Sequence, residues 1–370
     1  MKSAIGQCIQ LSVFGESHGE AIGVVIQGFP SGIPIDEKRI EKQMDLRKAR
    51  GKISTQRKES DIPVFLSGVF EGVTTGTPLC IMIRNENTRS RDYTKMKDIP
   101  RPSHADYTAQ VKYQGYQDYR GGGHFSGRLT AALTAAGALF LTLLESKGIF
   151  VGTHVQQIGN VKDDPFSDQE EILKQQICSL SCPLACLNRQ KAEEMEQVIL
   201  QASAQQDSVG GILESAVVGL PAGVGEPMFD SIESRLSHLL FSIGAVKGVE
   251  FGDGFALAEM LGSQARDEFI MDRGEIRTST NHNGGINGGI SNGMPLRIRT
   301  VIKPTPSIYQ MQHSVNMKTK EETELQIQGR HDPAIIHRAR VVVDSMIAFG
   351  LADLLSERYG ILWWKGEHHD

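Results

Sequence analysis

The chain has 370 residues, of which 39% are hydrophobic and 22% are charged. These values are typical of a globular protein with a sizeable core, and the length fits two average domains or one large domain. The net charge of −5 argues against non-specific binding of nucleic acid, so a site for an anion would need a local cluster of Arg and Lys.

The first half of the chain predicts strands followed by a buried helix. Residues 5–25 are typical of a strand, a glycine-rich turn and a second strand, and Asp36 is a candidate N-cap for the helix that follows it. Residues 64–72 and 78–83 predict two further strands around a Thr-Gly turn. Residues 129–144 are the most apolar segment, too short to span a membrane, and predict a buried helix.

The second half mixes strands and helices without strict alternation. Residues 163–206 are polar and helix-prone, and they predict an excursion on the surface. Residues 210–218 and 296–302 predict strands, whereas 229–241 and 337–355 have the apolar spacing of helices. We therefore expect an α+β fold with sheets packed against helices, in a single large domain.

The cysteines and the N-terminus bear on where the protein resides. The N-terminal residues lack the pattern of a secretory signal, and five cysteines are an odd number, so we expect a cytoplasmic protein with no membrane partner. Cys178, Cys182 and Cys186 do not have the C-x2-C spacing of zinc sites, and we interpret them as plain thiols. Their role stays open.

Basic residues gather in two segments that are poor in aliphatic residues. Such clusters in an acidic protein favour a pocket for a small polyanion, because the planar fork of Arg matches carboxylate and phosphate oxygens. A solvated basic surface loop is the alternative. The first cluster contains Arg47, Lys48, Arg50, Lys52, Arg57 and Lys58, and the second contains Arg84, Arg89, Arg91, Arg101, Arg120 and Arg128.

Three histidines, His18, His104 and His331, lie in turn-like settings among polar residues. A histidine with a pKa near neutrality is suited to donate a proton to a leaving oxygen or to a cofactor nitrogen. Structural roles and a metal site are the alternatives, although no pair has the i, i+4 spacing of a helical zinc site. We predict no metal.

Two glycine runs, at residues 121–123 and 284–289, would let backbone N–H groups approach an anion or a flat ring. The first run comes immediately before the apolar helix, so we expect a phosphate near that helix start. Neither run is a dinucleotide-binding fingerprint.

Taken together, these segments resemble the chorismate synthase family from about residue 6 to about residue 340. Any single motif is weak, but all of them occur in order over most of the chain. The motifs are GESHG at 15–19, RPSHAD at 101–106, DYRGGG at 118–123, AVKGVE at 245–250, GDG at 252–254, the Asn281-His282 stretch through Gly293, KPT at 303–305 and GRHDP at 329–333.

The resemblance implies a fold and a reaction. Family members are β-α-β sandwiches and homotetramers, and they act in the shikimate pathway of aromatic amino acid biosynthesis. As carbon–oxygen lyases they remove phosphate and a C6 hydrogen from 5-enolpyruvylshikimate-3-phosphate in an anti-1,4-elimination that gives chorismate. They need FMN in its reduced form (FMNH2), and its N5 takes part in removing the hydrogen. Whether this chain reduces its own FMN with NADPH, as some members do, stays open, as does a non-catalytic flavin binder.

The resemblance also implies roles for single residues. His18 would protonate the leaving phosphate, His104 would lie near the flavin ring, and Asp332 would be the base that lets N5 accept the C6 proton. Substrate contacts would come from Ser17, Arg47, Lys52, Arg101 and Arg128, with Arg330 beside them. FMN contacts would come from His124, Phe125, Ser126, Gly244, Ala245, Gly288, Lys303, Pro304, Thr305, Pro306, Ser307 and Arg330.

Several positions depart from the commoner family pattern. His124 and Phe125 replace Arg-Ser, Gly244 replaces Asn, and Lys52 replaces Arg. Gly244 has only its backbone to offer a ligand, and Lys52 presents a point charge instead of a bidentate fork. We interpret these differences as variation within the family.

Overall fold

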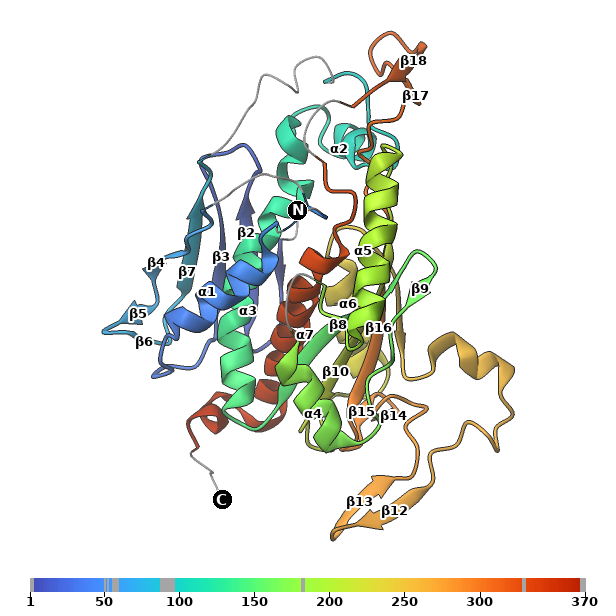
Figure 1. Ribbon diagram of the computed structural model, residues 1–370. Coiled ribbons are helices and arrows are strands. Elements are labelled where there is room, and N and C mark those ends of the chain that lie inside the picture. The colour runs from blue at the N-terminus through green and yellow to red at the C-terminus, as the bar shows by residue number, and fades with distance from the viewer. Residues whose placement is uncertain are drawn as a thin grey trace.

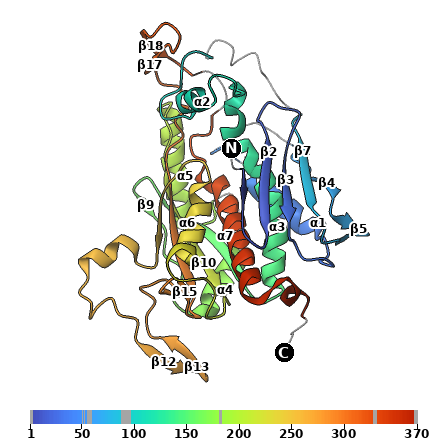
Figure 2. The same cartoon turned by 180° about the vertical axis from the view of Figure 1, so that it is seen from behind.

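The computed structural model describes residues 3–49, 51, 53–54, 60–86, 97–180, 184–327 and 331–366. Two five-stranded sheets enclose a layer of helices (Figures 1 and 2). This arrangement confirms the predicted α+β class and the β-α-β sandwich that the resemblance implies.

The first sheet contains the N-terminal strands in the order β1-β2-β3-β7-β4, all antiparallel. Apolar side chains alternate toward the helices, as in β3, where Ile22, Val24 and Ile26 are fully buried. The two strands and the turn predicted for residues 5–25 are confirmed. The bounds are β1 Ala4–Ile5, β2 Gln10–Gly15, β3 Ala21–Gln27, β4 Val64–Ser67 and β7 Leu79–Arg84.

The second sheet has the order β11-β16-β10-β8-β9 and is also antiparallel. Its central strand β10 is buried over six consecutive residues, because helices cover both faces there. This explains why residues 213–218 show no alternation of polar and apolar side chains. The bounds are β8 Phe150–Ile158, β9 Val161–Lys162, β10 Gly211–Val218, β11 Val246–Phe251 and β16 Leu296–Ile302.

The layer between the sheets is built on α3 and α7, which pack against each other. Helix α3 contacts β3 and β7 of the first sheet, and α7 contacts β8 and β10 of the second. The two helices approach closely at Gly137, where a Cβ atom would lie 2.1 Å from Ser345 Oγ. The bounds of the helices in this layer are α1 Glu37–Arg47, α3 Thr130–Glu145, α6 Ile232–Phe241 and α7 Ile336–Tyr359.

Segment Gly127–Glu145, which includes α3, is long and apolar enough to cross a membrane by composition. Within the protein, however, 78% of its most apolar window is buried. Its position between the two sheets is that of a core helix, as the sequence predicts for residues 129–144. The predicted N-cap of α1 is also confirmed, because the Asp36 side chain accepts a hydrogen bond from Arg39 N at 2.9 Å.

Helices α4 (Glu170–Ser179) and α5 (Arg189–Ala204) lie within the predicted surface excursion. Helix α4 packs on β8 and β10, on the face turned away from the helical layer, and α5 packs along β8 and β9. Beneath them the fully buried His154 lies between Asp163, at 3.1 Å, and Glu214, at 2.7 Å. Burial lowers the pKa of His154, but hydrogen bonds to both carboxylates outweigh this effect and raise it.

The remaining elements are short, and one corrects the sequence analysis. The single strand predicted over residues 64–72 is wrong, because Gly68 has a positive φ of 83° and divides it into β4 and β5. Hairpin β12–β13 extends away from the body (Figures 1 and 2). The bounds are α2 Asp106–Lys112, β5 Val69–Phe70, β6 Val73–Thr74, β12 Phe269–Asp272, β13 Glu275–Thr278, β14 Ile286–Asn287, β15 Ile290–Ser291, β17 Gln312–Val315 and β18 Glu322–Leu325.

Candidate active site

A cavity of about 650 Å³ lies where the start of α3, the end of α6 and the start of α7 meet. The segment after β16 closes one side of it. Its volume falls in the range of small-molecule sites. The charged residues among the described lining are five basic and one acidic, which suits a small anion: Arg47, Arg128, Lys247, Lys303, Arg338 and Asp332.

Most of the predicted site residues line this cavity, although they come from distant segments. Those in the lining are Arg47, His104, Phe125, Ser126, Arg128, Gly244, Ala245, Lys303, Thr305, Pro306, Ser307 and Asp332. Those described but outside the lining are Ser17, His18, Arg101, His124, Gly288 and Pro304. Lys52 and Arg330 lie outside the described residues.

His104 is held by a carboxylate that the sequence analysis did not single out. Its Nδ1 lies 2.8 Å from Asp106 Oδ1, and Asp106 also accepts hydrogen bonds from Arg101 Nε and Nη2, each at 2.7 Å. Burial would raise the pKa of Asp106, but the hydrogen bonds from Arg101 and His104 hold it well below its usual range. The ionised Asp106 therefore favours a proton on Nδ1 of His104 and fixes the ring.

The first glycine run passes between the two predicted catalytic histidines. A Cβ atom on Gly121 would lie 2.6 Å from Cδ2 of His18, and one on Gly122 would lie 3.2 Å from Cε1 of His104. Both glycines have positive φ angles, 59° and 83°. The backbone of the run therefore separates the buried His18 from His104, and a side chain at Gly121 would displace the His18 ring.

The prediction that this run immediately precedes the apolar helix is wrong. Two 3₁₀ turns, Arg120–Phe125 and Gly127–Leu129, intervene before α3 begins at Thr130. The glycines cannot continue an α-helix in their observed conformation, because all three have left-handed φ values. The start of α3 is instead contacted by Arg47, whose Nε donates to Thr130 Oγ1 at 3.0 Å.

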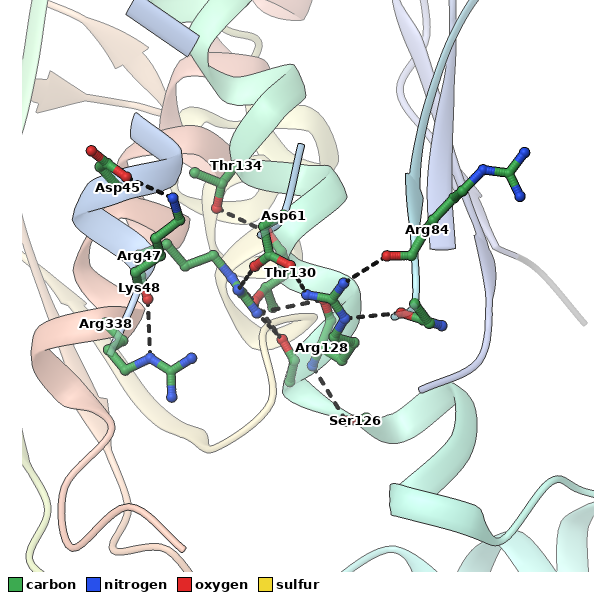
Figure 3. Close-up of polar contacts among 12 residues, drawn as sticks. Asp45, Arg47, Lys48, Asp61, Arg84, Ser126, Arg128, Thr130, Thr134 and Arg338 are labelled. Carbon is green, nitrogen blue, oxygen red and sulfur yellow. Dashed lines mark hydrogen bonds and ion pairs between the residues drawn. The ribbon is translucent and has the colours of Figure 1, made fainter. Parts of the chain in front are cut away.

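Arg47 and Arg128 share one carboxylate, that of Asp61 (Figure 3). Arg47 Nη1 donates to Asp61 Oδ2 at 3.2 Å, and Arg128 Nη1 donates to Oδ1. The three side chains are 5%, 6% and 2% exposed, so two cations and one anion are almost removed from water. Arg47 Nη2 also donates to Gly127 O at 2.8 Å and thereby ties α1 to the turn before α3.

Asp332 lies on the cavity wall in an ion pair with Arg338. Arg338 Nη1 is 2.5 Å from Asp332 Oδ2, and its Nε donates to the backbone oxygen of Arg47 at 3.0 Å. Arg338 therefore links the predicted base to the end of α1. His331 lines the same cavity, and burial together with the nearby charge of Arg101 lowers its pKa, which favours a neutral ring.

Of the predicted FMN contacts at residues 303–307, all but Pro304 line the cavity. Lys303 Nζ donates to Ser103 O at 2.7 Å, and Oγ1 of Thr305 is buried with no hydrogen-bond partner among the residues that the structure describes. A Cβ atom on Gly244 would meet nothing within 4 Å, so open space remains where the family usually has Asn. This part of the cavity therefore offers a ligand both a hydrogen-bonding atom, Thr305 Oγ1, and open space beside Gly244.

Gly288 is a predicted FMN contact that lies outside the lining of the cavity. It belongs to the β14–β15 turn, where Gly289 O accepts a hydrogen bond from Ile232 N at the start of α6. The cavity contains the residues at the opposite end of α6, about 15 Å away at 1.5 Å per residue. Within one chain, therefore, Gly288 is not brought to the cavity.

Sequence reasoning did not assign a role to several polar residues of the site, among them Asp61, Asn85, Asp106, Lys247 and Arg338. Asp106 and Arg338 lie within or just after the motifs at 101–106 and 329–333, so proximity in sequence was a usable signal. Asp61 and Asn85 follow polar or strand segments with no distinguishing pattern. Among the described residues, no group of three His, Cys, Asp or Glu side chains could hold a metal ion.

The sandwich and its basic, histidine-lined cavity define an enzyme that acts on a small anionic substrate. A family model described as chorismate synthase matches residues 9–356. The chain belongs to the chorismate synthase family, and with it to the carbon–oxygen lyases.

Relatives over the full length agree with this placement. The chain is 45% identical to a chorismate synthase of Thermococcus gammatolerans over 98% of this chain and 99% of that protein. It is 46% identical to one of Lachnoclostridium phytofermentans, with 95% of each chain covered. A crystal structure of a chorismate synthase superposes with a TM-score of 0.75 at 28% identity and covers 96% of this chain and 94% of that one.

Proposed function

We propose that this chain removes phosphate and a C6 hydrogen from 5-enolpyruvylshikimate-3-phosphate and releases chorismate, with reduced FMN as cofactor. The observation that carries the proposal is the cavity, in which five basic side chains meet His104 and Asp332. Such a site fits a substrate with a phosphate and carboxylates, because guanidinium groups stabilise the charge that develops on the leaving oxygen.

The residues at the cavity fit a flavin. Its volume of about 650 Å³ accommodates a substrate-sized ligand beside a flat ring, and Phe125 adds an aromatic surface. Among the described residues, the buried Thr305 Oγ1 has no hydrogen-bond partner and the space next to Gly244 is open. Residues 303–307 and 244–245 would hold the cofactor. When bound, reduced FMN supplies electron density to the breaking C–O bond.

His18 is the proposed acid for the departing phosphate. It lies behind the glycine run and is buried, so its proton is shielded from bulk water. Protonation lowers the cost of expelling a phosphate dianion. Because His18 is outside the lining of the cavity, we infer that the substrate phosphate reaches it along the edge of the run at Gly121.

Asp332 is the proposed base at the opposite end of the reaction. Its ion pair with Arg338 keeps the carboxylate on the cavity wall, where it would accept the C6 proton through the flavin. Arg338 also contacts the backbone of Arg47, so the base and the anion-binding helix are held in one geometry. His104, fixed by Asp106, would hold the protonation state of the ring beside it.

The proposal extends to assembly and place in the cell. We propose a cytoplasmic homotetramer with no nucleic-acid or membrane partner. Exposed apolar side chains on the first sheet support self-association, since large apolar patches on a soluble chain commonly mark interfaces. Reduction of FMN by the protein itself with NADPH is a second candidate activity, and no observation favours it.

An anaerobic assay tests the function. Purified protein is mixed with 5-enolpyruvylshikimate-3-phosphate and photoreduced FMN, and chorismate absorbance and released phosphate are followed together. We expect equal amounts of both products, and only with reduced FMN. Tight FMN binding without product would show a non-catalytic flavin binder. Oxidation of NADPH in the absence of substrate would identify the reductase activity.

Loss of the proposed acid gives a sharper expectation. His18→Ala should bind FMN normally and turn over at least about a hundredfold more slowly, the usual effect of removing a general acid. The control is His313→Ala, because His313 is exposed on β17. Equal turnover in the two variants would remove His18 from the mechanism.

A further inference from the structure

The side chain of Asn85 joins the turn that carries His18 to Arg128. Its Nδ2 donates to the backbone oxygens of Glu16, at 3.0 Å, and Gly19, at 2.9 Å. Its Oδ1 accepts a hydrogen bond from Arg128 Nε at 3.0 Å. One amide therefore contacts both ends of the His18 turn and one of the arginines that line the cavity.

The turn that carries His18 has further contacts, because Ser17 N donates to Gly123 O at 3.1 Å and His124 Nδ1 lies 2.9 Å from Gly15 O. Gly19 N donates to Glu16 O at 3.1 Å, which closes the turn on itself, and Asn85 N donates to Glu20 O at 3.0 Å, just after it. Asn85 directly follows β7, the strand that pairs with β3. Asn85 therefore anchors the turn that carries His18 to the end of a strand in the first sheet.

Arg128 is held from a second side by Asp61, which also holds Arg47. Hydrogen bonds thus run without interruption from the His18 turn through Asn85, Arg128 and Asp61 to Arg47. The backbone of Arg47 then accepts from Arg338, the partner of Asp332. The network connects the segment of the proposed acid with that of the proposed base.

Asparagine is the side chain that suits this position. It offers two donors and one acceptor from a rigid planar group, and all three functions are used here. Aspartate would keep the acceptor for Arg128 but could not donate to the two carbonyl oxygens. Alanine would lose all three contacts. The two substitutions therefore separate the contact with the turn from the contact with Arg128.

We propose that Asn85 is a positioning residue for the reaction, which sets His18 relative to Arg128 so that acid and cation act on the same phosphate. The inference rests on the proposed function. Asn85 does not line the cavity, and it acts through the backbone of residues 16–19 and through the Arg128 guanidinium.

Steady-state kinetics of two variants test the proposal. Asn85→Asp should lower kcat by about tenfold or more and leave KM within about threefold, because the acid is misplaced while Arg128 keeps its acceptor. Asn85→Ala should lower kcat similarly and also raise KM, because Arg128 loses that acceptor. Wild-type kcat in Asn85→Asp would overturn the proposal.

The matched control is Asn188→Ala. Asn188 also makes hydrogen bonds through both ends of its amide, as the N-cap of α5 and to Asp164, and it lies far from the cavity residues in sequence and on the outer side of the second sheet. It should lower Tm without changing kcat or KM. An equal fall in kcat in this variant would show a general stability effect and overturn the specific role.

A measurement without substrate separates this inference from the proposed function. The Cε1–H signal of His18 is assigned by NMR through its loss in His18→Gln. It should shift in both Asn85 variants and stay in place in Asn188→Ala. An unmoved signal in Asn85→Ala would overturn the inference even if chorismate forms. A moved signal would support it even if the wild-type protein proved to catalyse another reaction.

Discussion

Asp61 places one negative charge between two arginines in a part of the fold that water hardly reaches. Two buried guanidinium groups would repel each other and lose most of their hydration, so the carboxylate makes their proximity tolerable. It also holds both groups at the cavity wall. The remaining positive charge of the trio is available to attract an anion.

Asp61→Asn should therefore destabilise the fold strongly, by about 3–5 kcal/mol, because it leaves two buried cations without their shared partner. Urea unfolding measures the loss. Added phosphate should recover part of it in the variant, since an anion can take the place of the carboxylate. Asp45→Asn is the control, because its pair with Lys48 on α1 is 40% and 35% exposed and contributes little. Equal losses in the two variants would contradict this account.

The sequence motifs predicted the residues that act on ligands better than the residues that support them. His104 and Asp332 were predicted from their motifs and line the cavity. Asp61 and Asn85 were not predicted, because their partners are remote in sequence: Arg128 lies 67 and 43 positions away. Such networks depend on tertiary packing, which periodicity and local motifs do not encode.

At the scale of elements, the first turn of α7 carries a histidine buried in the protein. His337 is 4% exposed, and its Nε2 lies 2.6 Å from Ser54 Oγ. Its Nδ1 is buried and has no hydrogen-bond partner within the described part of the chain. Burial lowers the pKa of His337 to about 4, so the contact that joins residue 54 of the first basic segment to α7 involves a neutral ring.

This burial makes stability depend on pH in a predictable direction. The pKa of His337 is about 6.5 in the unfolded chain and about 4 in the fold, so protonation favours unfolding. The stability that the neutral His337 ring contributes is fully present above pH 6.5 and is lost as the pH falls toward 4. When the pH is lowered from 6.5 to 4, the free energy of unfolding should fall by about 3 kcal/mol less in His337→Gln than in the wild type, as measured by urea titrations. His313→Gln, an exposed control, should follow the wild type. Parallel curves for His337→Gln and wild type would contradict the prediction.

The helices and strands with a clear apolar period were predicted with approximately correct bounds, whereas the glycine that interrupts one of the strands was not predicted. The helix predicted over residues 337–355 begins one residue earlier and continues to Tyr359, because α7 is the central helix and its apolar pattern is sustained. Residues 64–72 were predicted as one strand, although Gly68 divides them. Local conformations of single glycines depend on contacts that the sequence alone does not display, such as that of Gly68 with Leu79.

For the whole molecule, the outer face of the first sheet is the feature that bears on assembly. Phe14, Gly23, Met82 and Val64 lie in one row across four strands. Phe14 is 38% exposed and Val64 is 44% exposed. A second copy of the chain could cover this row, since homo-oligomers commonly use one patch on both partners.

Val64→Glu should shift the protein toward smaller species in sedimentation velocity, because a charge would have to be buried at the interface. Ile172→Glu is the matched control: Ile172 is 42% exposed on α4, away from this sheet. An unchanged sedimentation coefficient for Val64→Glu would contradict an interface at this row.

The backbone of the glycine run at residues 121–123 lies between two histidines. His18 lies on one side of it and His104 on the other, and the run has no side chain that could carry a proton between them. In the proposed reaction, His104 would therefore exchange its proton with Asp106 and the flavin, and His18 would give its proton to the departing phosphate. The glycine run would thereby keep the protonation of the leaving phosphate separate from the proton transfer at the flavin.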